Sequence, residues 1–153
     1  MNQKNSRKRN LVIVRAGENS LHDGWLSKPY DERSFDLVVS YFSETAFNAH
    51  IETEGVLPVL HVGGKWDGLH KTLIGMKWED YEFFWLPDDD IETNGDVIDT
   101  MFQMAREHGL AVCQPSLSRQ SYFTHFMFSQ CRAFQLRYTN HIEIMVPCLN
   151  RTM

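Results

Sequence analysis

The sequence predicts an α/β sandwich whose central sheet is mostly parallel. Short apolar segments at 11–14, 35–42, 56–62 and 81–86 are bounded by polar residues, glycine or proline. Near-continuous hydrophobicity of this kind is typical of strands that are buried on both faces, as in a parallel sheet. Segments with helical spacing of apolar residues lie between the later strands, an order that favours right-handed crossovers.

Two helices and two further strands complete the predicted order. The segment 65–80 has apolar residues at helical spacing. The segment 94–110 has a stronger apolar face, acidic residues in its first turn, and Gly109 as a natural stop. The segment 110–117 has the pattern of another buried strand. In 141–147, HIEIMVP, apolar and polar residues alternate, which predicts a strand with one polar face.

Length and composition limit the organisation and the function classes. A chain of 153 residues is long enough for one domain, which we expect over residues 10–153 after a flexible polar tail over residues 1–9. The formal charge of -5 argues against general nucleic-acid binding, because such binding needs a positive surface. No apolar run approaches the roughly 18 residues that a membrane span needs.

The cysteines and the start of the chain indicate a compartment. Cys113, Cys131 and Cys148 are odd in number and widely spaced, which is typical of reduced core residues. The first residues lack the apolar segment of a secretory signal. We therefore expect a cytoplasmic protein.

Three consecutive carboxylates, Asp88, Asp89 and Asp90, follow the fourth predicted strand. Adjacent like charges repel, and either water or a bound cation offsets that repulsion. The triplet falls between the carboxyl end of a strand and a helix, which is where open α/β sheets bind ligands. A helix-leading acidic turn remains an open interpretation, since aspartate caps helices and suits their N-termini.

Three kinds of site besides a helix cap use aspartates in such a turn. A calcium loop starting at Asp90 would place Met101 where a bidentate acid is required, and a strand precedes it instead of a helix. An aspartyl-phosphatase site needs a downstream lysine and acidic pair, which the sequence after Asp99 does not supply. In a metal–diphosphate site, Asp88 and Asp90 hold Mg²⁺ or Mn²⁺ together with nucleotide phosphates, because these ions prefer oxygen ligands.

A glycine pair and a lysine follow the third predicted strand. Gly63 and Gly64 allow the backbone to approach a ligand, and Lys65 brings positive charge. The Gly-x-x-x-x-Gly-Lys spacing of a P-loop is absent, so this feature supports a phosphate site only in combination with the aspartates.

The order strand, Gly-Gly-Lys, helix, strand, Asp-x-Asp is similar to that of GT-A type nucleotide-sugar transferases. A closer resemblance is to an uncharacterised glycosyltransferase-like family, some of whose members carry the label "lysine-ketoglutarate reductase trans-splicing related". The stretches that carry it are NLVIVRAGENSLHDGWL, RSFDLVVSYF, KWDGLHKTL, YEFFWLPDDDIE, HGLAVCQPSLS and RYTNHIEIMVPCLNR. They cover nearly everything from residue 10 to residue 151. The resemblance implies a GT-A-like, Rossmann-like αβα sandwich that binds a nucleotide-diphosphate sugar.

The resemblance also implies roles for individual residues. Asp88 would contact the ribose or the metal, Asp90 would be a ligand of Mn²⁺ or Mg²⁺, and Lys65 would face the nucleotide or its diphosphate. Four residues of the first two strands would lie beside the base: Arg15, Ala16, and Asp36 or Tyr41. Plainer interpretations stay open, since arginine is common on surfaces and tyrosine readily buries its ring.

Members of this family continue past the segment 141–147 into a part that supplies acceptor contacts and often the catalytic base. We therefore expect an incomplete GT-A-like domain, in which Glu143 is a weak candidate for a catalytic acid or base. One hypothesis is metal-dependent glycosyl transfer to a glycan or small-molecule acceptor. The alternative is a non-catalytic nucleotide-, sugar- or partner-binding domain. The aromatic segment 122–128 either packs or exposes an apolar surface for self-association.

Overall fold

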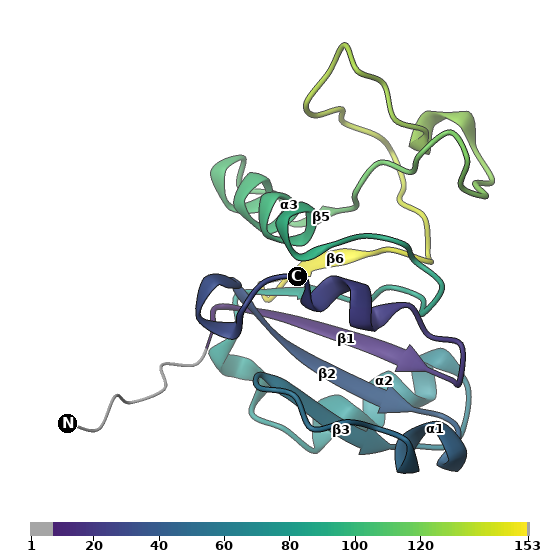
Figure 1. The fold of residues 1–153 in the computed structure, drawn as a ribbon. Helices are drawn as coiled ribbons and strands as arrows, with labels where there is room; N and C mark the ends of the chain where they lie inside the picture. Colours follow the sequence, from purple (N-terminus) through teal and green to yellow (C-terminus); the bar gives the residue numbers. More distant parts are fainter. Residues whose placement is uncertain (1–7, 153) are drawn as a thin grey trace.

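The computed structural model describes residues 8–152 and confirms the predicted α/β class with a six-stranded, mostly parallel sheet (Figure 1). The strand order is β3-β2-β1-β4-β6-β5, in which β1 to β4 are parallel and β6 runs antiparallel to both β4 and β5. The strands are β1 (Asn10–Ala16), β2 (Phe35–Tyr41), β3 (Val56–Leu60), β4 (Phe83–Trp85), β5 (Val112–Cys113) and β6 (Cys148–Asn150). This arrangement is compatible with a Rossmann-like fold.

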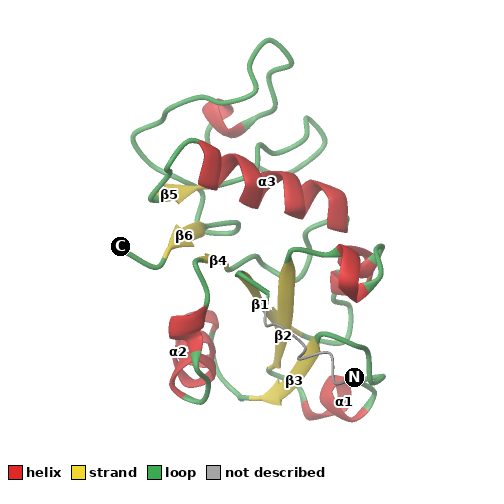
Figure 2. Cartoon of the chain, turned by 90° about the vertical axis from the view of Figure 1, so that its left-hand side faces the viewer, coloured by secondary structure: helices red, strands yellow, loops and turns green. Residues whose placement is uncertain are grey.

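Helices cover both faces of the sheet, which gives three layers. The α-helices are α1 (Glu44–Asn48), α2 (Lys65–Ile74) and α3 (Gly95–Glu107). Short 3₁₀ helices are η1 (His22–Leu26), η2 (Tyr30–Glu32), η3 (Trp78–Asp80) and η4 (Phe126–Phe128). Helix α2 lies on one side of the sheet, and α1 and α3 lie on the other (Figure 2). The helices predicted within 65–80 and 94–110 are therefore both present.

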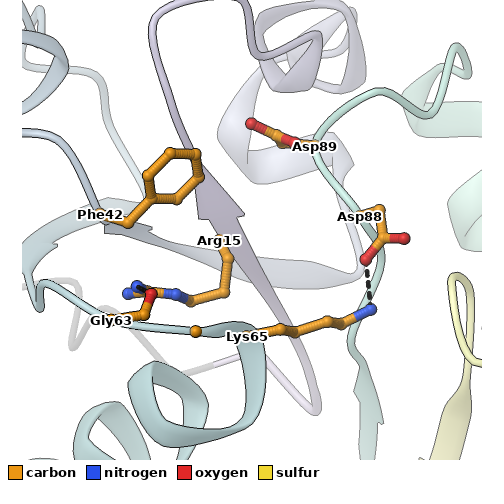
Figure 3. Close-up of a pocket in the computed structure, with 7 residues that line it drawn as sticks. Arg15, Phe42, Gly63, Lys65, Asp88 and Asp89 are labelled. Atoms are coloured by element: carbon orange, nitrogen blue, oxygen red, sulfur yellow. Dashed lines mark hydrogen bonds and ion pairs between the residues drawn. The ribbon is translucent and has the colours of Figure 1, made fainter.

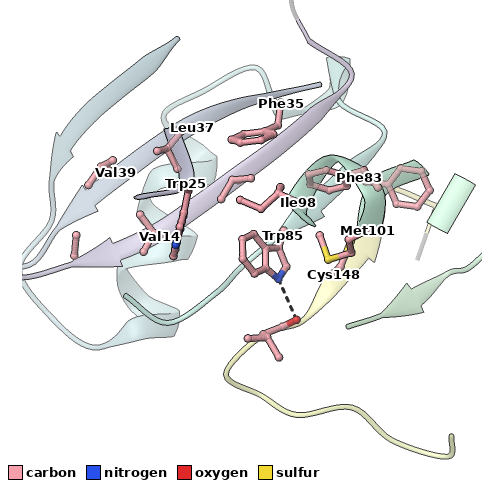
Figure 4. Close-up of a cluster of buried hydrophobic side chains, with 14 of the residues drawn as sticks. Val14, Trp25, Phe35, Leu37, Val39, Phe83, Trp85, Ile98, Met101 and Cys148 are labelled. Carbon is pink, nitrogen blue, oxygen red and sulfur yellow. Dashed lines mark hydrogen bonds between the residues drawn. The ribbon is translucent and has the colours of Figure 1, made fainter. Parts of the chain in front are cut away.

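Strand β1 is buried along its whole length, which explains its continuous apolar sequence. Leu11 and Ile13 pack with residues of α2, whereas Val12 and Val14 pack with residues of α3. The larger of the two clusters contains Trp25 and Trp85, whose ring centroids are 5.3 Å apart (Figure 4). Both indole N–H groups donate to backbone carbonyls, so neither polar group is left unpaired in the core.

The strand predicted over 141–147 is wrong, because these residues adopt no regular structure and β6 begins immediately after them. The segment still runs beside the end of β4: Leu86 N donates to Pro147 O at 2.9 Å and Asp88 N donates to Met145 O at 2.8 Å. Pro147 has no N–H to donate, which interrupts the ladder, so regular pairing starts at Cys148. Ile144, expected on an apolar face, is 63% exposed.

Residues 114–147 form a long excursion between β5 and β6 that extends away from the sheet (Figure 1). The strand predicted over 110–117 is correspondingly shorter, since β5 covers two residues and Pro115 cannot donate to a ladder. The aromatic segment 122–128 is divided: Phe128 is buried, whereas Tyr122 and Phe126 are 80% and 83% exposed. The self-association that exposed apolar surface would support stays a prediction.

The predicted tail is described only in part, because residues 1–7 lie outside the described residues. Arg9 is held against the sheet: its guanidinium is 2.6 Å from the Glu82 carboxylate, and its carbonyl accepts from Glu82 N. Between residues 8 and 152, no helix is both long enough and apolar enough to cross a membrane.

Candidate functional site

A cleft of about 290 Å³ lies at the carboxyl ends of β1 and β4 (Figure 3). Its lining residues are Arg15, Phe42, Gly63, Gly64, Lys65, Asp88 and Asp89. The sheet order reverses here, since β2 and β3 follow β1 on one side and β4 lies on the other. Ligands of open α/β sheets bind at such a switch point. The cleft is therefore at the end of the sheet that the sequence indicated.

Lys65 and Asp88 form an ion pair across this cleft. Lys65 begins α2 and Asp88 follows β4, and the Lys65 Nζ to Asp88 Oδ1 distance is 2.5 Å. The ammonium group also donates to the carbonyl of Ile144 at 3.0 Å, which connects the excursion to the cleft. The side chains are 20% and 39% exposed, so the pair is accessible to a ligand that offers either group a new partner.

The structure brings Asp88 and Asp89, rather than Asp88 and Asp90, into the cleft lining. Asp89 Oδ2 accepts from Gly17 N at 2.9 Å, and its carbonyl accepts from Leu21 N at 2.7 Å. These bonds join the turn after β4 to the turn after β1. Asp90 is exposed to solvent. No sequence signal distinguished the carboxylates, because three consecutive aspartates do not show which pair converges.

Arg15 lies beneath the cleft as a buried side chain that is only 5% exposed. Its Nη1 donates to Ser40 O and Oγ at 3.2 and 2.8 Å. Its Nη2 donates to His61 O and Gly63 O at 2.6 and 2.7 Å. Burial lowers the pKa of Arg15, and the Asp67 carboxylate partly opposes that shift. The guanidinium therefore joins β1, β2 and the loop after β3, while its Nε finds no partner among residues 8–152.

Gly64 leaves the start of α2 open, whereas a Cβ added at Gly63 would lie 2.8 Å from Asp67 Oδ2. Gly63 has φ +134°, a backbone conformation that residues with a Cβ rarely adopt. Gly64 is the N-cap of α2, no side chain of the described residues caps it, and a Cβ there would meet no atom within 4 Å. Helix N-termini present unpaired N–H groups and partial positive charge. This edge of the cleft suits an anion.

Of the residues predicted to contact the base, Ala16, Asp36 and Tyr41 do not line the cleft. Ala16 is fully buried and outside the cleft lining, although its carbonyl accepts from Phe42 N. Tyr41 is buried, and its hydroxyl is 3.0 Å from His50 Nδ1. Asp36 lies at the amino end of β2, opposite Leu11, and accepts from two tyrosine hydroxyls at 2.8 Å. The structure therefore does not bring Asp36 to the cleft, which lies at the other end of the strands.

The tyrosine bonds of Asp36 predict an alkaline titration. Burial, together with the hydrogen bond to Asp36, raises the pKa of Tyr30 to about 12. The neutral phenol is favoured in the folded state, so its contribution to stability is complete below the ordinary pKa of about 10 and is lost as the pH rises through 12. A spectrophotometric tyrosine titration of Tyr30→Phe should lack one of the latest-ionising groups of the wild type. Identical curves would contradict this assignment.

Glu143, the candidate acid or base, lies in the excursion and outside the cleft lining. Its Oε1 accepts from Thr124 Oγ1 at 3.3 Å, and its backbone N–H donates to the Gln114 side chain. Its Oε2 is buried and has no hydrogen-bond partner among residues 8–152. The connection to the cleft is through the next residue, Ile144, whose carbonyl accepts from Lys65.

Within residues 8–152, no three His, Cys, Asp or Glu side chains are grouped so that they could hold a metal ion by themselves. Mg²⁺ and related ions are commonly bound by one or two carboxylates, with phosphate oxygens and water completing the shell. Asp88 and Asp89 both line the cleft, with the Asp88 carboxylate directed at Lys65 and the Asp89 carboxylate directed away from it (Figure 3).

A second hollow, of about 640 Å³, lies within the excursion and includes no residue of the predicted site. Three of the described residues that line it are arginines, Arg119, Arg132 and Arg137, and none is a carboxylate. Arg137 donates to the carbonyls of Met127 and Ser129, which gives it a structural role in the excursion.

Comparisons of the chain with known protein families, with curated protein sequences and with solved structures give no match.

Proposed function

We propose that this chain binds a nucleoside-diphosphate sugar in the cleft at the carboxyl ends of β1 and β4, with the help of a divalent cation. The observation that carries the proposal is that Lys65, the open start of α2 and two aspartates line one cleft at the switch point of a mostly parallel sheet. The same cleft contains the Gly-Gly-Lys and aspartate features that are similar to those of GT-A type transferases.

The positive edge of the cleft supports binding of the diphosphate. Gly63 and Gly64 expose backbone at the start of α2, where N–H groups and the helix dipole favour negative charge. Lys65 adds an ammonium group that can donate a hydrogen bond to a phosphate oxygen. On binding, this ammonium leaves the Asp88 carboxylate and pairs with the diphosphate.

The acidic edge of the cleft supports binding of Mn²⁺ or Mg²⁺. Departure of Lys65 frees Asp88 Oδ1, and Asp89 has one carboxylate oxygen in addition to the one that Gly17 N occupies. A cation held here would neutralise charge that develops on a diphosphate leaving group during glycosyl transfer.

A non-catalytic binding domain is the alternative, and one observation favours it. Glycosyl transfer to a hydroxyl acceptor needs a base near the reacting atoms. Glu143 is bonded to Thr124 and does not line the cleft, and the two aspartates that do are assigned to the cation. Nucleotide binding is therefore the part of the proposal that the cleft supports most directly.

Calorimetric titration of UDP and GDP, with and without Mn²⁺, tests the proposal. We expect one of the two to bind with a Kd of about 1 to 100 μM in the presence of Mn²⁺, roughly -8 to -5 kcal/mol. Uridine and guanosine serve as controls, and should not bind measurably because they lack the diphosphate. Absence of binding by both diphosphates in both conditions would mean that the triplet is a helix-leading turn. Release of UDP or GDP from the corresponding nucleotide sugars would then distinguish an enzyme from a binding domain.

A further inference from the structure

Two of the three cysteines lie directly opposite each other in the sheet. Cys113 of β5 and Cys148 of β6 are register partners in the antiparallel ladder. Such partners have Cα atoms about 4.5 to 5.5 Å apart, which is within the range of about 4.4 to 6.8 Å that a disulfide spans. Both side chains are free thiols. The register therefore places the two cysteines at a backbone separation that a disulfide can bridge.

The two thiols differ in a way that assigns an order of reaction. Cys148 is 1% exposed, whereas Cys113 is only half-buried. The neighbouring Cys148 thiol lowers the pKa of Cys113, and the Cys113 thiol together with burial raises the pKa of Cys148. The thiolate is the nucleophile in thiol–disulfide exchange. Cys113 is therefore the thiol that an external oxidant meets first.

The positions of the pair in the chain show what a bond between them would do. Cys113 immediately precedes the excursion of residues 114–147, and Cys148 immediately follows it. A covalent bond would therefore close the excursion at its base. The third cysteine, Cys131, lies inside the excursion and outside the β5–β6 ladder.

We propose that Cys113 and Cys148 form a reversible disulfide that closes the excursion, with a small-molecule disulfide such as oxidised glutathione as the oxidant. The Cys113 thiolate attacks one sulfur of the oxidant, which releases one glutathione thiol and leaves a mixed disulfide on Cys113. Cys148 then loses its proton to solvent and attacks the Cys113 sulfur, which expels the second glutathione thiol. The protein loses two electrons and two protons, and the oxidant gains both. This proposal is independent of nucleotide binding.

Incubation of the intact chain with oxidised glutathione, followed by alkylation, peptide mapping and mass measurement, tests the proposal. We expect a loss of about 2 Da, the two hydrogens given up in the exchange, with only Cys131 alkylated. The Cys131→Ser variant should cross-link like the wild type, and its Tm should rise by about 10 °C on oxidation, since the bond closes a long loop. Cys148→Ser should stop at a mixed disulfide on Cys113.

Three results would overturn the proposal. One is a wild-type chain that keeps three alkylatable thiols after oxidation. Another is a cross-link that includes Cys131. The last is a Cys131→Ser chain that fails to cross-link although its unfolding transition before oxidation matches that of the wild type. Cys113→Ser, a change at the less buried position, provides a second uncross-linked control whose fold does not depend on a hydroxyl at the buried Cys148 site.

Discussion

Replacing Arg15 with alanine is expected to lower the free energy of unfolding by about 4 kcal/mol, because a buried charged group that makes four hydrogen bonds is lost. The guanidinium makes four hydrogen bonds, and its loss leaves the carbonyls of His61 and Gly63 without their donor. A hydrogen bond from a charged donor contributes about 1.5 to 3 kcal/mol. Chemical denaturation should show a lower midpoint at unchanged slope, and the Tm should fall by about 12 °C.

A second substitution tests whether the Arg15 side chain lies against Gly68 of α2. A Cβ added at Gly68 of α2 would lie 2.2 Å from Arg15 Cζ, which no relaxed structure tolerates. Gly68→Ala should therefore destabilise the wild type. In the Arg15→Ala background the obstruction is absent, and the higher helix propensity of alanine should stabilise α2 by up to about 1 kcal/mol. The interaction free energy of this double-mutant cycle should reach about 2 kcal/mol.

The control for this cycle is Gly75→Ala, at the C-cap of the same helix. A Cβ at Gly75 would meet only ordinary contacts, at 3.5 Å from backbone oxygens. Its effect should stay within about 0.5 kcal/mol and be the same with and without Arg15. An equal loss of stability from Gly68→Ala in both backgrounds would refute the placement of Arg15 beneath α2.

Asp88→Asn is expected to weaken UDP or GDP binding about 100-fold in the presence of Mn²⁺, because the cation loses a charged ligand. Without Mn²⁺ the same change should leave the affinity unchanged or raise it, since a carboxylate no longer repels the diphosphate. The asparagine keeps the size of the side chain and an oxygen that can accept from Lys65. A loss of affinity that occurs only in the presence of Mn²⁺, measured by calorimetry, distinguishes a metal ligand from a residue that only shapes the cleft.

Matched variants in the same loop test which carboxylate, besides that of Asp88, contributes to Mn²⁺-dependent binding. Asp89→Asn should weaken Mn²⁺-dependent binding more than Asp90→Asn, because Asp89 lines the cleft and Asp90 is exposed to solvent. Glu92→Gln changes an exposed carboxylate of the same segment and should leave binding unaffected. If Asp88→Asn reduced affinity equally with and without Mn²⁺, the cation role of Asp88 would be wrong.

The sequence alone determined the α/β class, the main strands and the end of the sheet where the cleft lies. This was within reach because burial on both faces leaves a continuous apolar segment, and β1 shows that pattern at every position. Helix α3 was also predictable from the sequence. Asn94 caps its start, and Gly109, at φ +59°, follows its end. Such patterns involve residues that are close in the chain, so a single sequence is enough to detect them.

Only the tertiary structure decided which residues meet. It placed Asp89 in the cleft, buried Arg15 beneath it and left Asp36 at the opposite end of β2. The segment 141–147, predicted as a strand, is irregular in the structure. Strand β6 lies between β4 and β5, which makes Cys113 and Cys148 neighbours. The physical reason is that these features depend on pairing between segments far apart in the chain, and local periodicity carries no information about a partner.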